Sequence, residues 1–394
     1  MCAHPTGRWC KKVLGRLHYF GPLAEPQMAL DKWLKEKDYL LAGQVPPGER
    51  PEGITLRVLG NRFLKHKQKL MQNGELSPRT FADCYRTCSN LIEHFGKFRL
   101  LESLTQEDFA SYRVKLAERL GPVALGNEIQ KTRSVFKFAM EVGMTKTPVV
   151  FGPEFKRPSK KTLRLERAKK GPKLFTAAEL RKLIDGAGIP LKAMILLACN
   201  AGLGNSDLAN MQLAAVDLES GWVDYPRVKT GVARRFPLWP ETVEAVRASI
   251  ADRPTPKSEA DTGLLFVTKY GGRWCKGTFE QDGKAVTLDD SPAEEGAVGK
   301  RPKPTINNDN EITKEFNKLF ADAKVNRKTG RSFYVLRHIF ETVAGDSRDQ
   351  APVDHIMGHA RDDMASVYRE SIGDDRLKAV VDHVHAWLFG HKKA

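Results

Sequence analysis

Residues 334–342 of the chain read YVLRHIFET, and residues 356–369 read IMGHARDDMASVYR. His359 lies twenty-two residues after Arg337, and Tyr368 lies nine residues after His359. Apolar residues at helical spacing surround all three. An arginine fork and an imidazole can hold the oxygens of a phosphate, and a phenol can attack its phosphorus. The two segments therefore predict a phosphoryl-transfer site with Tyr368 as the nucleophile.

This order and spacing resemble the tyrosine recombinase (phage integrase) family, over residues 172–390 most clearly and over the rest of the chain more loosely. The family has an arginine in a His-x-x-Arg-His segment, then a Leu-Gly-His segment, then a tyrosine nine residues further on. The resemblance implies a multidomain, mainly α fold with small β-sheets, in which a helical (SAM-like) core-binding domain precedes an α-rich mixed α+β catalytic domain. It also implies double-stranded DNA as the partner, cleavage through a 3′-phosphotyrosyl intermediate, and no cofactor, metal or small-molecule substrate.

The resemblance assigns roles to five residues. Tyr368 would attack the phosphorus, Arg337 and His359 would stabilise the phosphorane, and Lys229, before a Thr-Gly turn, would protonate the leaving 5′ oxygen. Tyr334 replaces the histidine of the family's first segment and can still donate a hydrogen bond. Each role has an ordinary structural alternative: an ion-paired helix arginine, a helix-terminal histidine, a surface lysine or a core tyrosine.

One family position departs from the pattern. The first catalytic arginine of the family follows Gly-Leu, but here Gly202-Leu203 is followed by Gly204, and no arginine lies between Arg181 and Arg227. Loss of one fixed oxyanion donor typically slows a reaction by about 100- to 1000-fold. Either another arginine replaces the missing one, or the protein binds DNA without efficient cleavage. The candidate replacements are Arg234, Arg235, Arg273 and Arg331.

The composition points to a polyanionic partner. The chain has 394 residues, enough for two or three domains, and a formal charge of +16. Such an excess favours nucleic acid binding, and a basic protein with no nucleic acid partner is the alternative.

Residues 1–45 predict a small basic module. The first 21 residues contain four basic residues, no acidic residue and several glycines, which favours short strands. Leu30, Trp33 and Leu34 then follow at helical spacing. The module resembles the arm-type DNA-binding modules of some integrases, and a hairpin packed on the next domain is the alternative. Its predicted DNA contacts are Arg8, Lys11, Lys12 and Arg16.

Residues 55–145 predict a helical domain, and residues 146–173 predict a basic linker. Apolar residues at helical spacing indicate four helices, one of them with Thr105 as N-cap and Asp108 completing the capping box. The linker is either a solvated tether or a segment that follows backbone phosphates. Its predicted DNA contacts are Lys156, Arg157, Lys160, Lys161, Arg164, Lys169 and Lys170.

Residues 174–394 predict the catalytic domain. Thr176 and Glu179 form a capping-box pattern, residues 191–199 predict a buried helix, and residues 222–240 predict a hairpin with Arg234 and Arg235 as DNA contacts. Residues 277–311 have the composition of a mobile insertion. An apolar stripe on residues 377–388 predicts a terminal helix that either covers its own domain or, as is common in recombinases, joins protomers of a homo-oligomer assembled on DNA.

Several other classes of protein are not expected. No apolar stretch is long enough to span a membrane, the start lacks a signal-peptide core, and six scattered cysteines do not suggest disulfides, so the cytoplasm is the expected location. Two histidines four residues apart, and a Cys/His group near the start, are weak metal patterns. The functional alternatives are a noncatalytic DNA-binding protein on a recombinase scaffold and a helical partner-binding protein with a basic surface.

Overall fold

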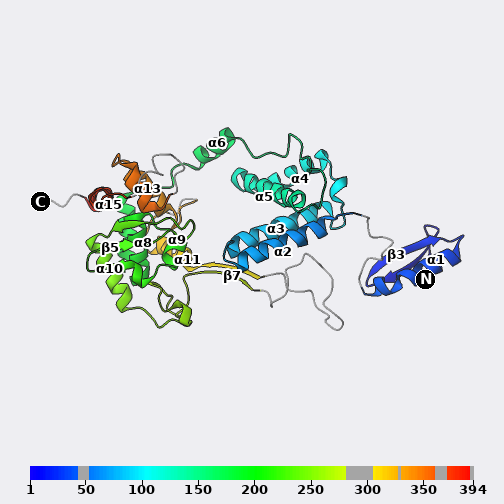
Figure 1. The fold of residues 1–394 in the computed structure, drawn as a ribbon, viewed down its shortest axis with the longest axis horizontal. Helices are drawn as coiled ribbons and strands as arrows, with labels where there is room; N and C mark the ends of the chain where they lie inside the picture. Colours follow the sequence, from blue (N-terminus) through cyan, green and yellow to red (C-terminus); the bar gives the residue numbers. More distant parts are fainter. Residues whose placement is uncertain (43–52, 281–304, 327–329, 360–370, 391–394) are drawn as a thin grey trace. The chain divides into compact units, whose positions relative to one another are not determined.

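The computed structural model describes residues 1–42, 53–280, 305–326, 330–359 and 371–390. The fold is mainly helical with small β-sheets, which confirms the predicted fold class (Figure 1). Its contacts divide the chain into two compact units, with one boundary between Glu166 and Arg167. No helix within the described residues has both the length and the apolar composition that crossing a bilayer requires.

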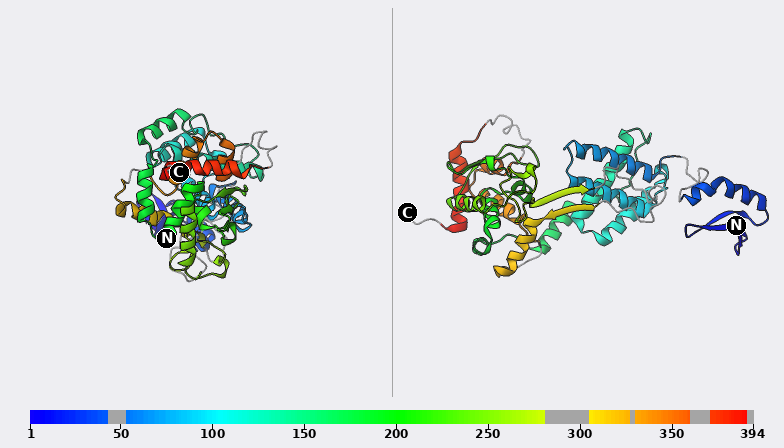
Figure 2. Two further views of the ribbon diagram at one scale, coloured as in Figure 1. Left: turned by 90° about the vertical axis from the view of Figure 1, so that its left-hand side faces the viewer. Right: turned by 90° about the horizontal axis from the view of Figure 1, so that it is seen from below.

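The first part of the chain forms a three-stranded antiparallel sheet covered by a helix. The strands are β1 (Cys2–His4), β2 (Arg8–Val13) and β3 (Arg16–Pro22), in the order β1-β2-β3. Leu14 and Gly15 join β2 to β3 with φ of 46° and 80°, as a two-residue turn between twisted strands requires. Helix α1 (Pro26–Leu41) packs on the sheet (Figure 2). The rings of Trp33 and Phe20 meet edge to face, with their centroids 5.4 Å apart.

Four helices form the next core, as the sequence predicts. They are α2 (Leu56–Gln72), α3 (Pro78–Phe95), α4 (Gln106–Arg119) and α5 (Pro122–Glu141), with the short 3-10 helix η2 (Leu101–Ser103) before α4. The capping box of Thr105 and Asp108 is present at the start of α4. Phe109 packs against Phe136, Phe151 and Phe155. The core therefore continues about ten residues beyond the predicted boundary at residue 145.

The predicted basic linker contains a helix. Residues 160–170 form α6 (Lys160–Lys170), none of whose residues is buried. The seven basic residues predicted to contact DNA between residues 156 and 170 are all exposed. Because no face of α6 packs on a core, the stability of this helix depends on the helix propensity of its residues and on contacts among its own side chains.

The second unit is built around a buried helix. The helix α8 (Ile189–Ala201) is buried at every position from Ala193 to Ala201 and packs against α7 (Ala177–Gly186), α10 (Pro240–Ala251), α11 (Glu311–Asp322) and α12 (Val335–Gly345). Thr176 and Glu179 form the predicted capping box at the start of α7. The buried Asn200 accepts a hydrogen bond from the backbone of Trp239 and donates one to the carbonyl of Pro237, both at 2.8 Å.

Short elements complete this unit. They are α9 (Asn205–Ala209), the 3-10 helices η3 (Leu213–Ala215) and η4 (Glu259–Asp261), the antiparallel strands β4 (Val216–Asp217), β5 (Trp222–Asp224) and β6 (Arg235–Pro237), and α13 (Gln350–Met357). Strands β5 and β6 are the arms of the predicted hairpin. Of the predicted insertion, residues 281–304 lie outside the described residues, and strands β7 (Cys275–Glu280) and β8 (Thr305–Asn310) at its two ends pair with each other.

The terminal helix α15 (Asp374–Phe389) packs into its own domain. Leu377, Val380, Val381, Val384 and Leu388 are buried in the core of the second unit. The indole of Trp239 donates a hydrogen bond to the carbonyl of Val381 at 3.0 Å. The apolar stripe is thus covered within one protomer, as the first of the two sequence interpretations expects.

Candidate active site

Arg337 lies in the first turn of α12 and is buried. Leu336, Ile339 and Phe340 pack into the core on either side of it, as the helical pattern predicts. Its guanidinium donates to the carbonyl of Gly202 at 2.6 Å and to that of Met357 at 2.8 Å. No carboxylate pairs with it within the described residues. Burial, followed by the nearby charge of Arg227, lowers the pKa of Arg337 below the usual range for arginine, but an arginine remains charged at neutral pH.

His359 follows the last turn of α13 and contacts Arg337. The turn ends at Gly358, whose φ of 64° is left-handed, and the backbone N–H of His359 donates to the carbonyl of Asp354 at 2.8 Å. The ring Nε2 lies 3.0 Å from a guanidinium nitrogen of Arg337. Because arginine only donates hydrogen bonds, Nε2 accepts this one, and in the neutral ring the proton is on Nδ1.

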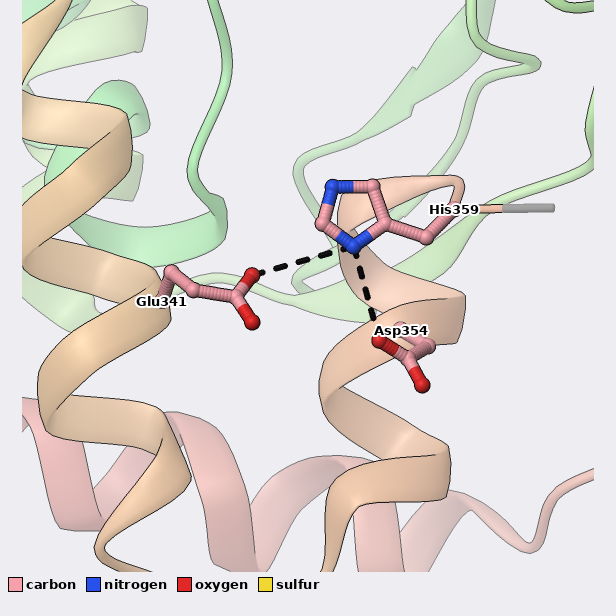
Figure 3. Close-up of side chains that lie close together, drawn as sticks. All are labelled: Glu341, Asp354 and His359. Atoms are coloured by element: carbon pink, nitrogen blue, oxygen red, sulfur yellow. Dashed lines mark hydrogen bonds and ion pairs between the residues drawn. The ribbon is translucent and has the colours of Figure 1, made fainter. Parts of the chain in front are cut away.

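Two carboxylates face the other ring nitrogen of His359, as Figure 3 shows. Nδ1 lies 3.4 Å from Asp354 on α13 and 3.7 Å from Glu341 on α12, and the amide of Gln350 donates to both carboxylates. These three ligand atoms lie within 4.8 Å of one another and are a possible metal-binding group. A metal on Nδ1 would move the proton to Nε2, where it would oppose the guanidinium donor. The arrangement therefore fits a carboxylate–histidine hydrogen bond better than a metal site.

The loop that follows α8 holds the position of the missing arginine. Gly202 ends α8 with a left-handed φ of 64°, and the backbone N–H of Gly204 donates to Asp207 at 3.0 Å. Gly204 itself has φ of −94° and ψ of 171°, which any residue can adopt. A Cβ there would lie 3.5 Å from both Asp207 and Tyr334, an ordinary contact distance. The backbone at position 204 can therefore accommodate a side chain, although the sequence has glycine there.

Among the residues that the structure describes, Lys229 and Tyr334 do not join this contact. Tyr368 lies outside the described residues. Lys229 is exposed at the tip of the β5–β6 hairpin and makes no hydrogen bond or ion pair with any described residue. Tyr334 is 47% exposed at the N-cap of α12, and its ring packs against His338. Arg337 and His359 are thus the two predicted residues that the structure brings into direct contact.

Two hairpin arginines, Arg227 and Arg234, approach the same turn of α13. Arg227 donates to the carbonyl of Gly358 at 3.2 Å. Arg234 is fully buried, forms an ion pair with Asp207 at 3.2 Å and donates to the carbonyl of Tyr225 at 2.9 Å. Neither Arg227 nor Asp207 is among the site residues predicted from the sequence. The predicted hairpin brings residues 227 and 234 near each other, but its pattern does not indicate which of them faces another helix.

The structure corrects one predicted DNA contact and restricts another. The side chain of Arg234 has no exposed surface, so it cannot be the surface contact that was predicted. Arg235 stacks on Trp222 and pairs with Asp224 and Asp374, so its charge is already partnered. In the first module, Arg8, Lys12 and Arg16 are exposed, and Lys11 lies 4.2 Å above the ring of Trp33.

Comparison with known families gives a match to the Phage integrase family over residues 168–372. Among solved structures, the integrase of the transposon Tn1549 in complex with circular intermediate DNA has a TM-score of 0.55 and 17% identity, over 83% of this chain and 99% of that one. A lambda integrase tetramer bound to a Holliday junction has a TM-score of 0.52 and 14% identity, over 94% of each chain. A lambda integrase dimer bound to a COC′ core site has a TM-score of 0.52 and 13% identity, over 81% of this chain and 99% of that one.

A comparison with curated proteins gives no match. At identities of 13–17% the solved structures establish a shared fold.

Proposed function

Because the chain belongs to the phage integrase family, whose pattern covers just over half of it, we propose that it is a site-specific DNA recombinase. The reaction is cleavage and rejoining of DNA strands through a 3′-phosphotyrosyl intermediate. One observation carries the proposal: the buried guanidinium of Arg337 has no carboxylate partner within the described residues and contacts His359 at 3.0 Å. A fixed, uncompensated cation of this kind is suited to an oxyanion.

The proposed chemistry uses side chains alone. The phenol of Tyr368 releases its proton to solvent as its oxygen forms a bond to the scissile phosphorus and the bond from phosphorus to the 5′ oxygen breaks. Arg337 and His359 stabilise the charge on the nonbridging oxygens, and Lys229 gives a proton to the leaving 5′ oxygen. Attack of a 5′ hydroxyl on the phosphotyrosyl bond then joins the strands and frees the tyrosine. Tyr334, exposed next to the loop that holds Gly204, donates a hydrogen bond to the DNA backbone.

The remaining domains supply DNA binding in this proposal. The module of residues 1–45 is an arm-type binding module, and the helical domain of residues 55–145 is the core-binding domain. The exposed basic residues of α6 and of the segment before it contact backbone phosphates, which position the protein without reading sequence. The protein acts on DNA in the cytoplasm.

The structural neighbours bind DNA as a dimer in one case and as a tetramer in another, and we propose that this chain also assembles as a homo-oligomer on DNA. The apolar stripe of α15 is already buried in its own domain. A role for α15 in assembly therefore requires exchange of the helix between protomers. An engineered disulfide that fixes α15 to α8 tests this requirement: it should prevent assembly on DNA and leave binding of one protomer unchanged, and normal assembly would exclude exchange.

The experiment that tests the proposed reaction begins with selection of a bound sequence from a random DNA pool. The selected duplex, nicked close to the cleavage position, traps a covalent adduct because the short strand diffuses away. Wild-type protein should form an adduct that resists denaturation, and Tyr368→Phe should form none. An adduct on the Phe variant would refute the assignment of the nucleophile.

A noncatalytic DNA-binding protein is the second candidate function, and Gly204 is the observation that favours it. Tight and selective binding without any adduct would establish it. A partner-binding protein with a basic surface is a third possibility. A steep loss of DNA affinity as salt rises would exclude it, since released counterions make phosphate binding strongly dependent on salt.

A further inference from the structure

The ion pairs of the second unit separate the arginines that can replace the missing one from those that cannot. Each candidate selected from the sequence already has a carboxylate partner. The pairs are Arg234 with Asp207, Arg235 with Asp224 and Asp374, Arg273 with Asp261, and Arg331 with Glu179. A guanidinium held in such a pair would have to break it before binding a phosphate.

Arg227 differs from these four. Within the described residues its side chain makes one hydrogen bond, to the carbonyl of Gly358, and no ion pair. It is partly exposed, so its remaining N–H donors can reach a ligand from solvent.

Arg227 also lies beside Arg337. The two guanidinium groups donate to successive carbonyls of one turn, Arg337 to Met357 and Arg227 to Gly358. The proximity of the two charges contributes to the lowered pKa of Arg337. The β carbon of Arg227 is so close to Gly358 that a Cβ on the glycine would lie 2.9 Å from it. The hairpin and α13 are thus in direct contact where His359 begins.

Two of the three arginines at this turn form no ion pair within the described residues. Asp207 pairs with Arg234, the most buried of the three, and the carboxylates of Asp354 and Glu341 face the opposite ring nitrogen of His359. Arg227 and Arg337 therefore bring two guanidinium groups without a direct carboxylate partner to one partly buried turn, an arrangement that favours the binding of an anion. A phosphodiester carries one negative charge, and its phosphorane transition state carries two.

We propose that Arg227 supplies the second guanidinium at the scissile phosphate, in place of the arginine that is absent at position 204. This inference rests on the proposed recombinase function. Arg227 donates to a nonbridging oxygen beside Arg337. Arg234 is a positioning residue that holds Asp207, and through it the loop containing Gly204.

The test uses single-turnover cleavage of the nicked duplex at saturating protein, together with DNA affinity and thermal unfolding. Arg227→Ala should lower the cleavage rate by about 100- to 1000-fold, with a much smaller loss of DNA affinity. Arg227→Lys, which keeps the charge but not the planar guanidinium, should retain part of the cleavage rate. Its residual activity would exclude misfolding as the cause of the loss in the alanine variant. Arg247→Ala is the matched control, because it removes one positive charge from a half-exposed side chain of the same unit, far in sequence from the site.

A double variant that moves the arginine from position 227 to position 204 provides a second test. An arginine at position 204 has room for its Cβ, so Gly204→Arg combined with Arg227→Ala should recover at least about tenfold of the lost rate, equivalent to roughly 1.4 kcal/mol of transition-state stabilisation. A rate for Arg227→Ala within about threefold of wild type would overturn the inference. Absence of any wild-type adduct would instead refute the proposed function. An adduct formed by Gly204→Arg but not by wild type would show that Arg227 does not replace the missing arginine at the scissile phosphate.

Discussion

The ion pair between Asp207 and Arg234 predicts a large effect of removing one carboxylate charge. The two groups are 3.2 Å apart, and their side chains are 10% and 0% exposed. Asp207→Asn leaves the buried guanidinium without its counter-charge, which typically costs about 3–5 kcal/mol. The substitution also leaves one carbonyl oxygen for two donors, since the other carboxylate oxygen accepts from Gly204. We expect the free energy of unfolding to fall by about 3–5 kcal/mol.

The ion pair between Asp224 on β5 and Arg235 on β6 provides the control. Asp224 pairs with Arg235 at 2.6 Å, but these side chains are 65% and 37% exposed, and Arg235 keeps a second partner in Asp374. An exposed pair contributes about 0–1 kcal/mol, so Asp224→Asn should change stability little. Urea unfolding followed by tryptophan fluorescence measures both, because four of the six tryptophans, at positions 222, 239, 274 and 387, lie in this unit.

Two outcomes would contradict the stability predicted for the pair of Asp207 and Arg234. If Asp207→Asn and Asp224→Asn differ by less than about 1 kcal/mol, the buried pair does not carry the energy that its environment implies. If adding Arg234→Met to Asp207→Asn restores no stability, the loss comes from the bond to Gly204 and not from an uncompensated charge.

Three further predictions concern other parts of the chain. Gly358→Ala places a side chain at a φ of 64° and within 3.0 Å of two arginine side chains, so it should lower stability by about 1–3 kcal/mol. Gly345→Ala, at the end of α12, has open space and no positive φ and should be nearly neutral in thermal unfolding. Burial raises the pKa of the Cys199 thiol to about 12, so this thiol is protonated at neutral pH and should resist a thiol reagent in the folded protein, while the exposed Cys2 reacts; modification of both at equal rates, read by mass spectrometry, would contradict this. Alanine at Lys160, Lys161 and Arg164 should lower DNA affinity for all sequences alike and reduce the slope of log affinity against log salt by up to about three; an unchanged slope would exclude phosphate contacts by this helix.

Local signals in the sequence predicted much of the fold. Thr105 and Thr176 start helices through capping boxes whose partners lie three residues away, so the information is local. The continuous apolar run of α8 likewise predicted a buried helix, and the pattern of residues 222–240 predicted a hairpin. The end of the helical domain was missed because Phe151 and Phe155 lie in an irregular segment without periodicity. The helix at residues 160–170 was not predicted because the density of basic charge indicates a linker, although Lys, Arg, Leu and Glu favour helices.

The site was predictable only in part. The spacing of Arg337 and His359 predicted that they would meet, and they do. The choice among the hairpin arginines depended on which face of a strand packs against α13 and which carboxylate each arginine finds. Those partners come from residues up to 139 positions away, as with Arg235 and Asp374, and no local pattern indicates them.

Arg235, the first residue of strand β6, and Arg234 just before it connect two regions of the second unit. Successive side chains of an extended chain point to opposite sides, so Arg234 reaches the loop beside Gly204 while Arg235 holds the first turn of α15 by two hydrogen bonds to Asp374. Displacement of α15 would break the hydrogen bonds from Arg235 to Asp374 and the bond from the indole of Trp239 to Val381. Strand β6, which follows Arg234 directly, would then lose its contacts with α15. The terminal helix and the loop that contains Gly204 are therefore coupled through Arg235 and Arg234, so the effect of a variant at either end should be measured at both.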